Sequence, residues 1–331
     1  MRLRMVSAAG ALLVVSVMVT GCGDRHDAGP VPQRAPRASQ EVRALTLPLD
    51  AFALQLPDLT RVQNAEDALT RTCMARQHLR WPGIHRDPHG SPDQWPNRYR
   101  YGLIEPEVAR RFGYHPLPDP EADRRSVQYH ARQASLSSRQ RLAAYGRDGE
   151  GGCRAEAVRH LLAGVPHPDW ELLNRTSTET YRRAGRTKAV THALREWSTC
   201  MRQHGFAYAD PSAAGDDRHW NTTTPTEPEI RTALTDVACK HRSGLVDVWR
   251  ETESALQRQA VDAHPDAFHA LERAKTRYMS NVRTALARPG GQPAPAPCAA
   301  AAPAGGCGVT TRPAQTSSPG REATRQSPPP L

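Results

Sequence analysis

The hydrophobic positions in the last third of the chain recur at intervals of three and four, which is the spacing of one face of an α-helix. The pattern starts near residue 226 and meets few helix-breaking residues before Pro265, which should end the first helix near His264. A stripe this long favours packing within the protein's own core over a coiled coil with a partner. Its members are Ile230, Leu234, Val237, Leu245, Val248, Trp249, Leu256 and Val261, then Phe268, Leu271, Tyr278, Val282 and Leu286.

A short sequence occurs twice, as TCMARQHLRW at 72–81 and as TCMRQHGFAY at 199–208. A helical apolar stripe precedes each cysteine, and an alternation with a period of two follows it, which predicts a helix and then a short extended segment. The helical stripes are Leu59, Val62, Leu69 and Cys73 in the first copy and Val190, Leu194, Trp197 and Met201 in the second; the extended segments carry Leu79 with Trp81 and Phe206 with Tyr208.

Each copy is followed by a second cysteine in a helical context, Cys153 in GGCRAEAVRHLL and Cys239 in EIRTALTDVACK. The order is therefore helix with cysteine, extended segment, loop, and helix with cysteine, twice. We predict a mainly α fold with short extended segments, built from two cysteine-stapled modules at residues 45–165 and 166–287. Strands do not alternate with helices, which argues against a solute receptor of the periplasmic binding-protein type.

The first residues have the features of a bacterial lipoprotein signal. Two arginines precede an apolar stretch from Ala8 to Val19, which is long enough for a signal peptide but short for a membrane span. The stretch ends in VTGC, a pattern in which the cysteine is diacylated and becomes the mature N-terminus. We therefore expect a signal peptide at 1–21, a diacylglyceryl anchor on Cys22 that inserts into membrane lipid, and a location on the outer face of the cell membrane.

Two stretches lack hydrophobic periodicity. Residues 22–44 contain several prolines and are expected to form a flexible tether after the lipidated cysteine. Residues 288–331 are rich in Pro, Ala, Gly, Ser and Thr, and such a composition predicts a disordered tail because it cannot bury enough apolar surface to fold. The folded part is then about residues 45–287, which suffices for one large domain or two small ones.

The cysteines of an exported protein are expected to form disulfides. The four cysteines of the modules allow three pairings. The repeat favours closure within each module, Cys73 with Cys153 and Cys200 with Cys239, although pairings between the modules stay open. In the tail, Cys298 and Cys307 could close a small ring, but no packing argument decides that pair.

A metal or catalytic role for Cys200 and His204 is the alternative to a disulfide. Zinc could be held by this pair together with Cys239 and His241, but the spacing is unlike that of a usual zinc knuckle. The first copy has Gln77 where the second has His204, so the repeat preserves hydrophobic residues rather than polar chemistry. We expect no metal and no cofactor.

The formal net charge of +10 raises the question of an anionic partner. Nucleic acid is not expected, because the positive charges are scattered among Asp and Glu without a long basic run or interleaved aromatic residues. The remaining candidates are an anionic wall polymer and another envelope protein.

Several stretches together resemble a family of lipoproteins and secreted proteins of actinomycete bacteria: LPLDAF (47–52), AEDALTRTCM (65–74), RYGLIEPEVARRFGYH (100–115), GGCRAEA (151–157) and TDVACK (235–240). The resemblance covers roughly residues 45–287. No activity is assigned to this family, so the resemblance implies a location and a type of fold, and it names no reaction, ligand or catalytic residue.

Other candidate chemistry is sparse. His85, Asp87 and His89 could bind a metal, although solvated loop histidines are more common. Two acidic pairs, Glu105 with Glu107 and Glu227 with Glu229, lie at expected helix starts, where negative side chains favour the first turn and Thr226 with Glu229 forms a capping box. We therefore expect a non-catalytic binding or interaction module of the cell envelope; an envelope hydrolase with an unrecognised active site is the alternative.

Overall fold

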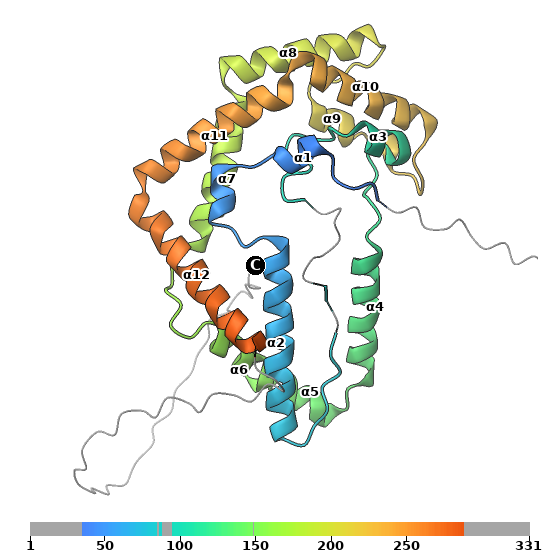
Figure 1. Cartoon of the computed structure of the whole chain (residues 1–331). Helices are drawn as coiled ribbons and strands as arrows, with labels where there is room; N and C mark the ends of the chain where they lie inside the picture. The colour runs from blue at the N-terminus through green and yellow to red at the C-terminus, as the bar shows by residue number, and fades with distance from the viewer. Residues whose placement is uncertain (1–34, 85, 88–94, 148, 288–331) are drawn as a thin grey trace, which may run out of the picture. The chain divides into compact units, whose positions relative to one another are not determined.

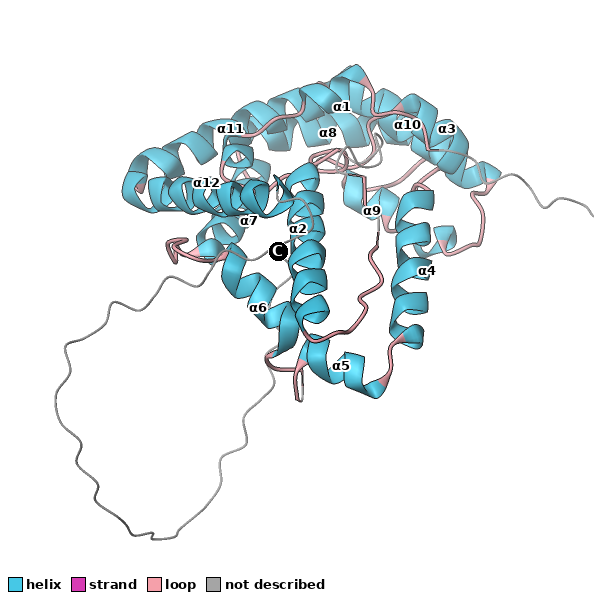
Figure 2. Cartoon of the chain, turned by 60° about the horizontal axis from the view of Figure 1, so that its bottom comes forward, coloured by secondary structure: helices cyan, strands magenta, loops and turns pink. Residues whose placement is uncertain are grey.

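The computed structural model describes residues 35–84, 86–87, 95–147 and 149–287. These residues form helices joined by loops (Figures 1 and 2). They contain two isolated β-bridges and no β-strand. The mainly α fold class is thereby confirmed. The helices are α1 Gln40–Ala44, η1 Pro48–Ala51, α2 Leu56–Arg76, α3 Pro106–Phe112, α4 Pro120–Ser135, α5 Ser138–Tyr145, α6 Gly152–Leu161, α7 Trp170–Gly185, α8 Lys188–Gln203, α9 Pro211–Gly215, η2 Arg218–Trp220, α10 Glu227–Ser243, α11 Leu245–Ala263 and α12 Pro265–Ala287.

Local sequence signals set the ends of the last three helices. The side chain of Thr226 accepts a hydrogen bond from Glu229 N, and the Glu229 carboxylate accepts one from Thr226 N, so the expected capping box begins α10. Gly244 adopts a left-handed conformation with φ of 60° and separates α10 from α11, which the apolar pattern alone ran together. Helix α11 ends before His264 and Pro265 begins α12, as the proline predicts.

The two disulfides join the cysteines that the repeat paired. Cys73 on α2 bonds Cys153 on α6, and Cys200 on α8 bonds Cys239 on α10, with Cα separations of 5.5 and 5.6 Å. After each helix the chain continues without helix or strand. Trp81 is buried and Leu79 partly so, with exposed Arg80 between them, which matches the expected alternation. The residues Cys22, Cys298 and Cys307 lie outside the described part of the chain.

The hydrophobic cores cross the expected boundary between residues 165 and 166. In the first core, α12 packs against α2 and α6, and Tyr278, Met279 and Val282 of α12 lie among the apolar residues of those helices. Conversely, α3 of the first half packs against α10 of the second half and buries Val108 and Phe112 beside Val237. Each disulfide therefore closes a pair of helices within one half, but each half is completed by a helix from the other.

The stretch just before residue 45 differs from the expected tether. Residues 35–44 pack on the fold, where Ala38 and Val42 share a buried cluster with Tyr101 and Ile104. The backbone N–H of Ser39 donates to the Glu105 carboxylate at 2.7 Å, and the Ser39 hydroxyl caps α1. The apolar residues of this stretch show no helical or strand periodicity in the sequence. They are buried because they contact Tyr101 and Ile104, which are distant in sequence.

Candidate functional site

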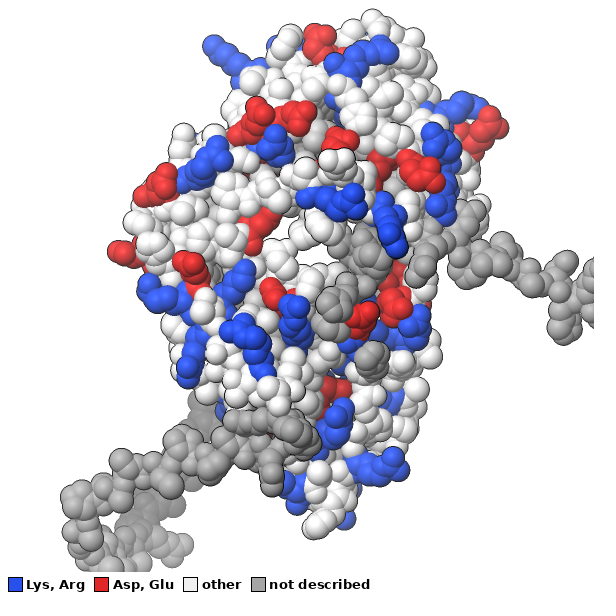
Figure 3. All heavy atoms as spheres, in the orientation of Figure 1, with Lys and Arg blue, Asp and Glu red and all other residues white. Residues whose placement is uncertain are grey.

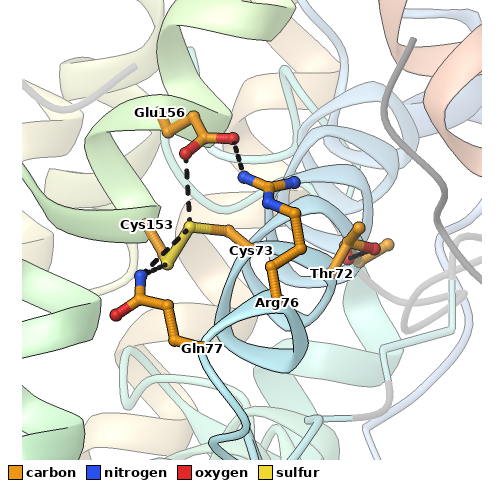
Figure 4. Close-up of a disulfide and its surroundings, with 7 residues drawn as sticks. Thr72, Cys73, Arg76, Gln77, Cys153 and Glu156 are labelled. Carbon is orange, nitrogen blue, oxygen red and sulfur yellow. Dashed lines mark hydrogen bonds and ion pairs between the residues drawn. A yellow bond between two sulfur atoms is a disulfide. The ribbon is translucent and has the colours of Figure 1, made fainter. Parts of the chain in front are cut away.

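The first disulfide has the surroundings of a structural crosslink. Both of its cysteines are buried, and Glu156 Oε2 lies 3.3 Å from Cys73 Sγ (Figure 4). Arg76 pairs with the same carboxylate, and the Gln77 amide donates to Cys153 Sγ at 3.4 Å. Both sulfurs are withdrawn from solvent, so an attacking thiolate has little access to this disulfide.

The second disulfide brings the expected Cys and His residues together without making them a metal site. Ligand atoms of Cys200, His204 and Cys239 lie within 4.8 Å of one another. The two sulfurs are bonded to each other, so neither is a thiolate that could bind a metal, and His204 Nδ1 lies 2.9 Å from the Cys200 carbonyl oxygen. His241 does not join this group, because its Nε2 pairs with Glu41 at 3.1 Å.

Buried charges gather instead around residues 97–115, the segment that leads into and past α3. Arg98 and Glu105 form a pair at 2.6 Å with both side chains buried. The next arginine, Arg100, pairs with fully buried Glu253 on α11, whose carboxylate also accepts a hydrogen bond from the Tyr101 hydroxyl at 2.9 Å. These pairs fix the segment to α11 on one side and to its own turn on the other.

The same segment reaches two more buried carboxylates on α10. The Leu103 carbonyl accepts a hydrogen bond from Lys240 Nζ at 2.8 Å, and Lys240 also pairs with Asp236 at 2.7 Å. Two residues beyond α3, the backbone N–H of Tyr114 donates to Glu229 at 2.8 Å, and the Tyr114 hydroxyl donates to Asp236 at 3.2 Å. Segment 97–115 is thus held by polar contacts along its length, which makes it a rigid wall.

Two glycines leave the space that the buried side chains of Lys240 and Glu229 occupy. Gly102 and Gly113 have φ of 79° and 55°, a region that disfavours other residues. A Cβ on Gly102 would lie 2.9 Å from Lys240 Nζ, and one on Gly113 would lie 2.4 Å from Glu229 Oε1. Any larger residue would displace the ammonium group or the carboxylate.

This wall borders two adjoining surface pockets, of about 270 and 380 Å³. They share Tyr114, His115, Gly215 and Asp216, so we treat them as one groove, the α9 groove. Its aromatic residues are Tyr99, Tyr114, Tyr181 and Trp220, and its polar side chains include Arg100, Ser212, Asp216 and Asp217. The groove combines ring faces with a small number of hydrogen-bonding groups, which is typical of ligand sites.

Both ring nitrogens of His115, a residue that lines the groove, lie within hydrogen-bonding distance of an acceptor. Its Nδ1 lies 2.8 Å from Glu229 Oε1, and its Nε2 lies 2.8 Å from the Thr222 carbonyl oxygen. Burial lowers the pKa of His115, but the hydrogen bonds to Thr222 and Glu229 together with the Glu229 charge outweigh it, so the pKa is raised. When His115 is protonated, both ring nitrogens donate to these acceptors, so the ring braces Glu229 against the Thr222 carbonyl rather than facing a ligand.

Asp217 lines the groove, and its carboxylate accepts a hydrogen bond from the hydroxyl of Tyr208, which is not among the lining residues. Asp217 accepts hydrogen bonds from His219 N, from the Tyr208 hydroxyl and from the His219 ring, and these lower its pKa to about 2. Burial, with the Asp217 hydrogen bond and charge, raises the pKa of Tyr208 to about 12. Asp217 therefore stays negative and Tyr208 neutral throughout the physiological range.

The groove lacks the features of an activated nucleophile among its described lining residues. Ser212 is exposed, but the one histidine that lines the groove uses both nitrogens elsewhere. The Tyr114 hydroxyl is bound to Asp236, and burial is the main cause that raises its pKa, so it does not ionise. Lys240 and Asp236 lie beneath the wall with fully buried side chains, out of reach of a substrate in the groove.

Sequence reasoning found the disulfides but missed the groove. Glu105 and Glu229 lie at the helix starts that the sequence predicts, and they are also buried against Arg98 and His115, which no local signal indicates. The only signal for the groove was the RYGLIEPEVARRFGYH stretch, which carries Arg100, Gly102, Tyr114 and His115. Of the loop residues His85, Asp87 and His89, only Asp87 lies within the described chain.

The comparisons with known proteins add no relative. No family model, curated protein or solved structure was found to match the chain. Among the described helices, none combines the length and the apolar character that a membrane crossing requires.

Proposed function

We propose that this protein is a lipid-anchored module of the cell envelope that binds a saccharide chain in the α9 groove. The observation that carries the proposal is the set of aromatic rings along a polar groove whose wall is fixed by buried ion pairs. The C–H faces of a sugar ring pack on aromatic rings, while its hydroxyls require nearby hydrogen-bonding groups.

The rings of the groove differ in exposure, which suits an extended ligand. Tyr99 is 50% exposed and lines one of the two pockets, whereas Trp220 lines the other. Tyr114 and Trp220 are stacked with centroids 6.2 Å apart and planes at 25°, and the Trp220 indole N–H donates to the Ala214 carbonyl at 2.8 Å. These two rings are held before any ligand arrives, which lowers the entropy lost on binding.

The polar side chains of the groove can orient a bound saccharide through hydrogen bonds. Arg100 lies over the Tyr181 ring at 5.0 Å while its guanidinium pairs with Glu253 and donates to the Ser177 carbonyl. Its charge is balanced by Glu253, so the groove does not require an anion. Ser212 and Asp216 are exposed and able to bond to sugar hydroxyls.

Binding of oligosaccharides released from a bacterial wall polysaccharide, measured by titration calorimetry, tests this function. We expect Tyr99→Ala and Asp216→Asn each to weaken binding about tenfold, since each removes one ligand contact of roughly 1.4 kcal/mol. Tyr129→Ala is the matched control, because Tyr129 is similarly exposed, at 43%, but lies on α4 outside the groove. Equal affinities in all three variants would reject the groove as the binding site.

The lipid anchor is the second part of the proposal and rests on the VTGC pattern at Cys22. In a detergent phase-partitioning experiment on cell extracts, the wild-type protein should enter the detergent phase, and the Cys22→Ser variant should enter the aqueous phase. Unchanged partitioning of the variant would reject the anchor.

The alternative is an envelope hydrolase, and the Asp236–Lys240 pair gives it no support, because both side chains are fully buried and neither lines the groove. Burial raises the pKa of Asp236 and lowers that of Lys240, as it does for any ion pair withdrawn from water. The same oligosaccharides decide between the two functions. If the wild type shortens them and Asp216→Asn does not, the groove is catalytic and the binding function is wrong.

A further inference from the structure

A separate basic groove lies between α2 and α12. It has a volume of about 450 Å³ and is lined by Asp58, Arg61, Lys275, Thr276, Met279 and Arg283. None of these residues belongs to the α9 groove, so this site is independent of the saccharide proposal. Three cations and one carboxylate face the same hollow.

The charges in this groove are not balanced within the described chain. Arg61 pairs with Asp58 at 3.1 Å, which neutralises one of the three cations. Lys275 Nζ donates only to the Ala51 carbonyl at 2.8 Å, which leaves its charge and two of its protons for another partner. The exposed side chain of Arg283 forms no hydrogen bond or ion pair with any described residue.

Helix geometry aligns the two unbalanced cations. Lys275, Met279 and Arg283 follow one another at four-residue intervals, so they lie on one face of α12. Their backbones span about 12 Å over eight residues, and Arg61 lies across the groove on α2. Buried Met279 lies between the two cations as an apolar floor, and Thr276 adds a hydroxyl. The arrangement fits a ligand that carries more than one negative charge.

We propose that the α2–α12 groove binds phosphate groups of an anionic ligand. Arginine binds phosphate oxygens through two parallel hydrogen bonds, and lysine binds them as a point charge. In the space-filling view, Lys and Arg side chains gather over α12 and the adjoining part of α2, which gives this face an excess of positive charge (Figure 3). The phosphate can belong to a soluble phosphate chain or to the headgroups of a phospholipid surface.

The test uses the full mature chain with Cys22→Ser, so that the anchor does not dominate vesicle binding. Tripolyphosphate binding is measured by calorimetry at low salt in this background and in the double variant Lys275→Gln/Arg283→Gln. We expect at least about a tenfold loss of affinity in the double variant, because two charge-assisted contacts are removed. The matched control is Arg273→Gln/Arg277→Gln, which removes the same charge from exposed positions of the same helix outside the groove.

A second arm separates the two sources of phosphate. Sedimentation with phosphatidylglycerol vesicles, compared with phosphatidylcholine vesicles, reports binding to headgroups. Loss of either form of binding in the groove variant but not in the control supports the site. An equal loss in both variants shows only an effect of net charge and overturns the proposal, as does the absence of binding to both tripolyphosphate and phosphatidylglycerol.

Discussion

Each disulfide-linked half of the protein contains a buried aspartate that accepts a hydrogen bond from a tryptophan and pairs with a cation. In the first half, Asp67 accepts from the Trp81 indole N–H at 2.9 Å and pairs with Arg132 at 2.8 Å. In the second half, Asp236 accepts from Trp197 at 2.9 Å and pairs with Lys240 at 2.7 Å. The two halves therefore neutralise an interior carboxylate by the same means.

The cations differ in chemistry and surroundings. Arg132 binds Asp67 through a planar guanidinium, which also lies over the Trp81 ring at 4.5 Å. Lys240 is a single ammonium group, and burial lowers its pKa while it raises the pKa of Asp236. The first arrangement is a fixed brace that attaches α4, whereas the second joins α10 to the wall of the α9 groove. The difference teaches that the same buried carboxylate can be held by a guanidinium stacked on an indole ring in one half and by an ammonium group bonded to a backbone carbonyl in the other.

Removal of Lys240 should have the largest effect. Lys240→Met leaves the Asp236 charge buried without its partner and should reduce the free energy of unfolding by about 3 to 5 kcal/mol. Arg132→Met should cost less, because Asp67 keeps the Ile84 N–H and has Arg86 at 3.8 Å. Urea unfolding measures both. A larger loss for Arg132→Met would break the comparison, and Asp236→Leu/Lys240→Met should recover most of the loss.

The disulfides should come next. Replacement of the two cysteines of one disulfide by serine should lower the free energy of unfolding. The loop entropy gives upper figures of about 4.5 kcal/mol for Cys73–Cys153 and about 3.9 kcal/mol for Cys200–Cys239. The order follows from the sequence separations of 80 and 39 residues. Thermal unfolding of the two double variants provides the ranking. A reversed order would show that contacts around the bond, rather than chain entropy, set its contribution.

The pH dependence of stability should sharpen the comparison at the groove wall. The folded-state pKa of His115 is raised above its ordinary value of 6.5, so its contribution is complete below that value and is lost as the pH rises through the folded pKa. Unfolding midpoints between about pH 5 and 9 should therefore fall on the alkaline side, and less so in His115→Gln. Identical profiles for the variant and the wild type would assign the decline to other groups.

The smallest effects should come from the residues four positions after the first cysteine of each disulfide. Gln77 contacts the sulfurs of the first bond, and His204 lies beside the second. Both are exposed, so Gln77→Ala and His204→Ala should each change stability by less than about 0.5 kcal/mol. A large loss in His204→Ala alone would revive a special role for the Cys200–His204 pair.

Much of the secondary structure follows from local sequence. The three-and-four spacing of apolar residues predicted α10 to α12, Pro265 marked the start of the last helix, and Thr226 with Glu229 marked the start of α10. The repeated TCM unit predicted the disulfide pairing, because a duplicated module closes most simply on itself. These signals lie within a few residues of the features that they predict, or are repeated along the chain.

The sites depended on contacts that no short stretch contains. An acidic residue at a helix start looks the same in sequence whether it faces water or a buried cation, so Glu105 and Glu229 could not be told from ordinary caps. The tryptophans that bind Asp67 and Asp236 occupy different positions in the repeat, eight after Cys73 and three before Cys200, so the repeat did not reveal them.

The sequence by itself determined the helices with clear periodicity, such as α2, α8 and α10 to α12, and the crosslinks, since periodicity, caps and duplicated cysteines act locally. Only the tertiary structure decided which charges are buried together, which helix of one half completes the core of the other, and where the α9 and α2–α12 grooves form. The physical reason is that a side chain's burial and the charges around it depend on segments far apart in sequence, such as Arg100 and Glu253, which become neighbours only when the chain folds.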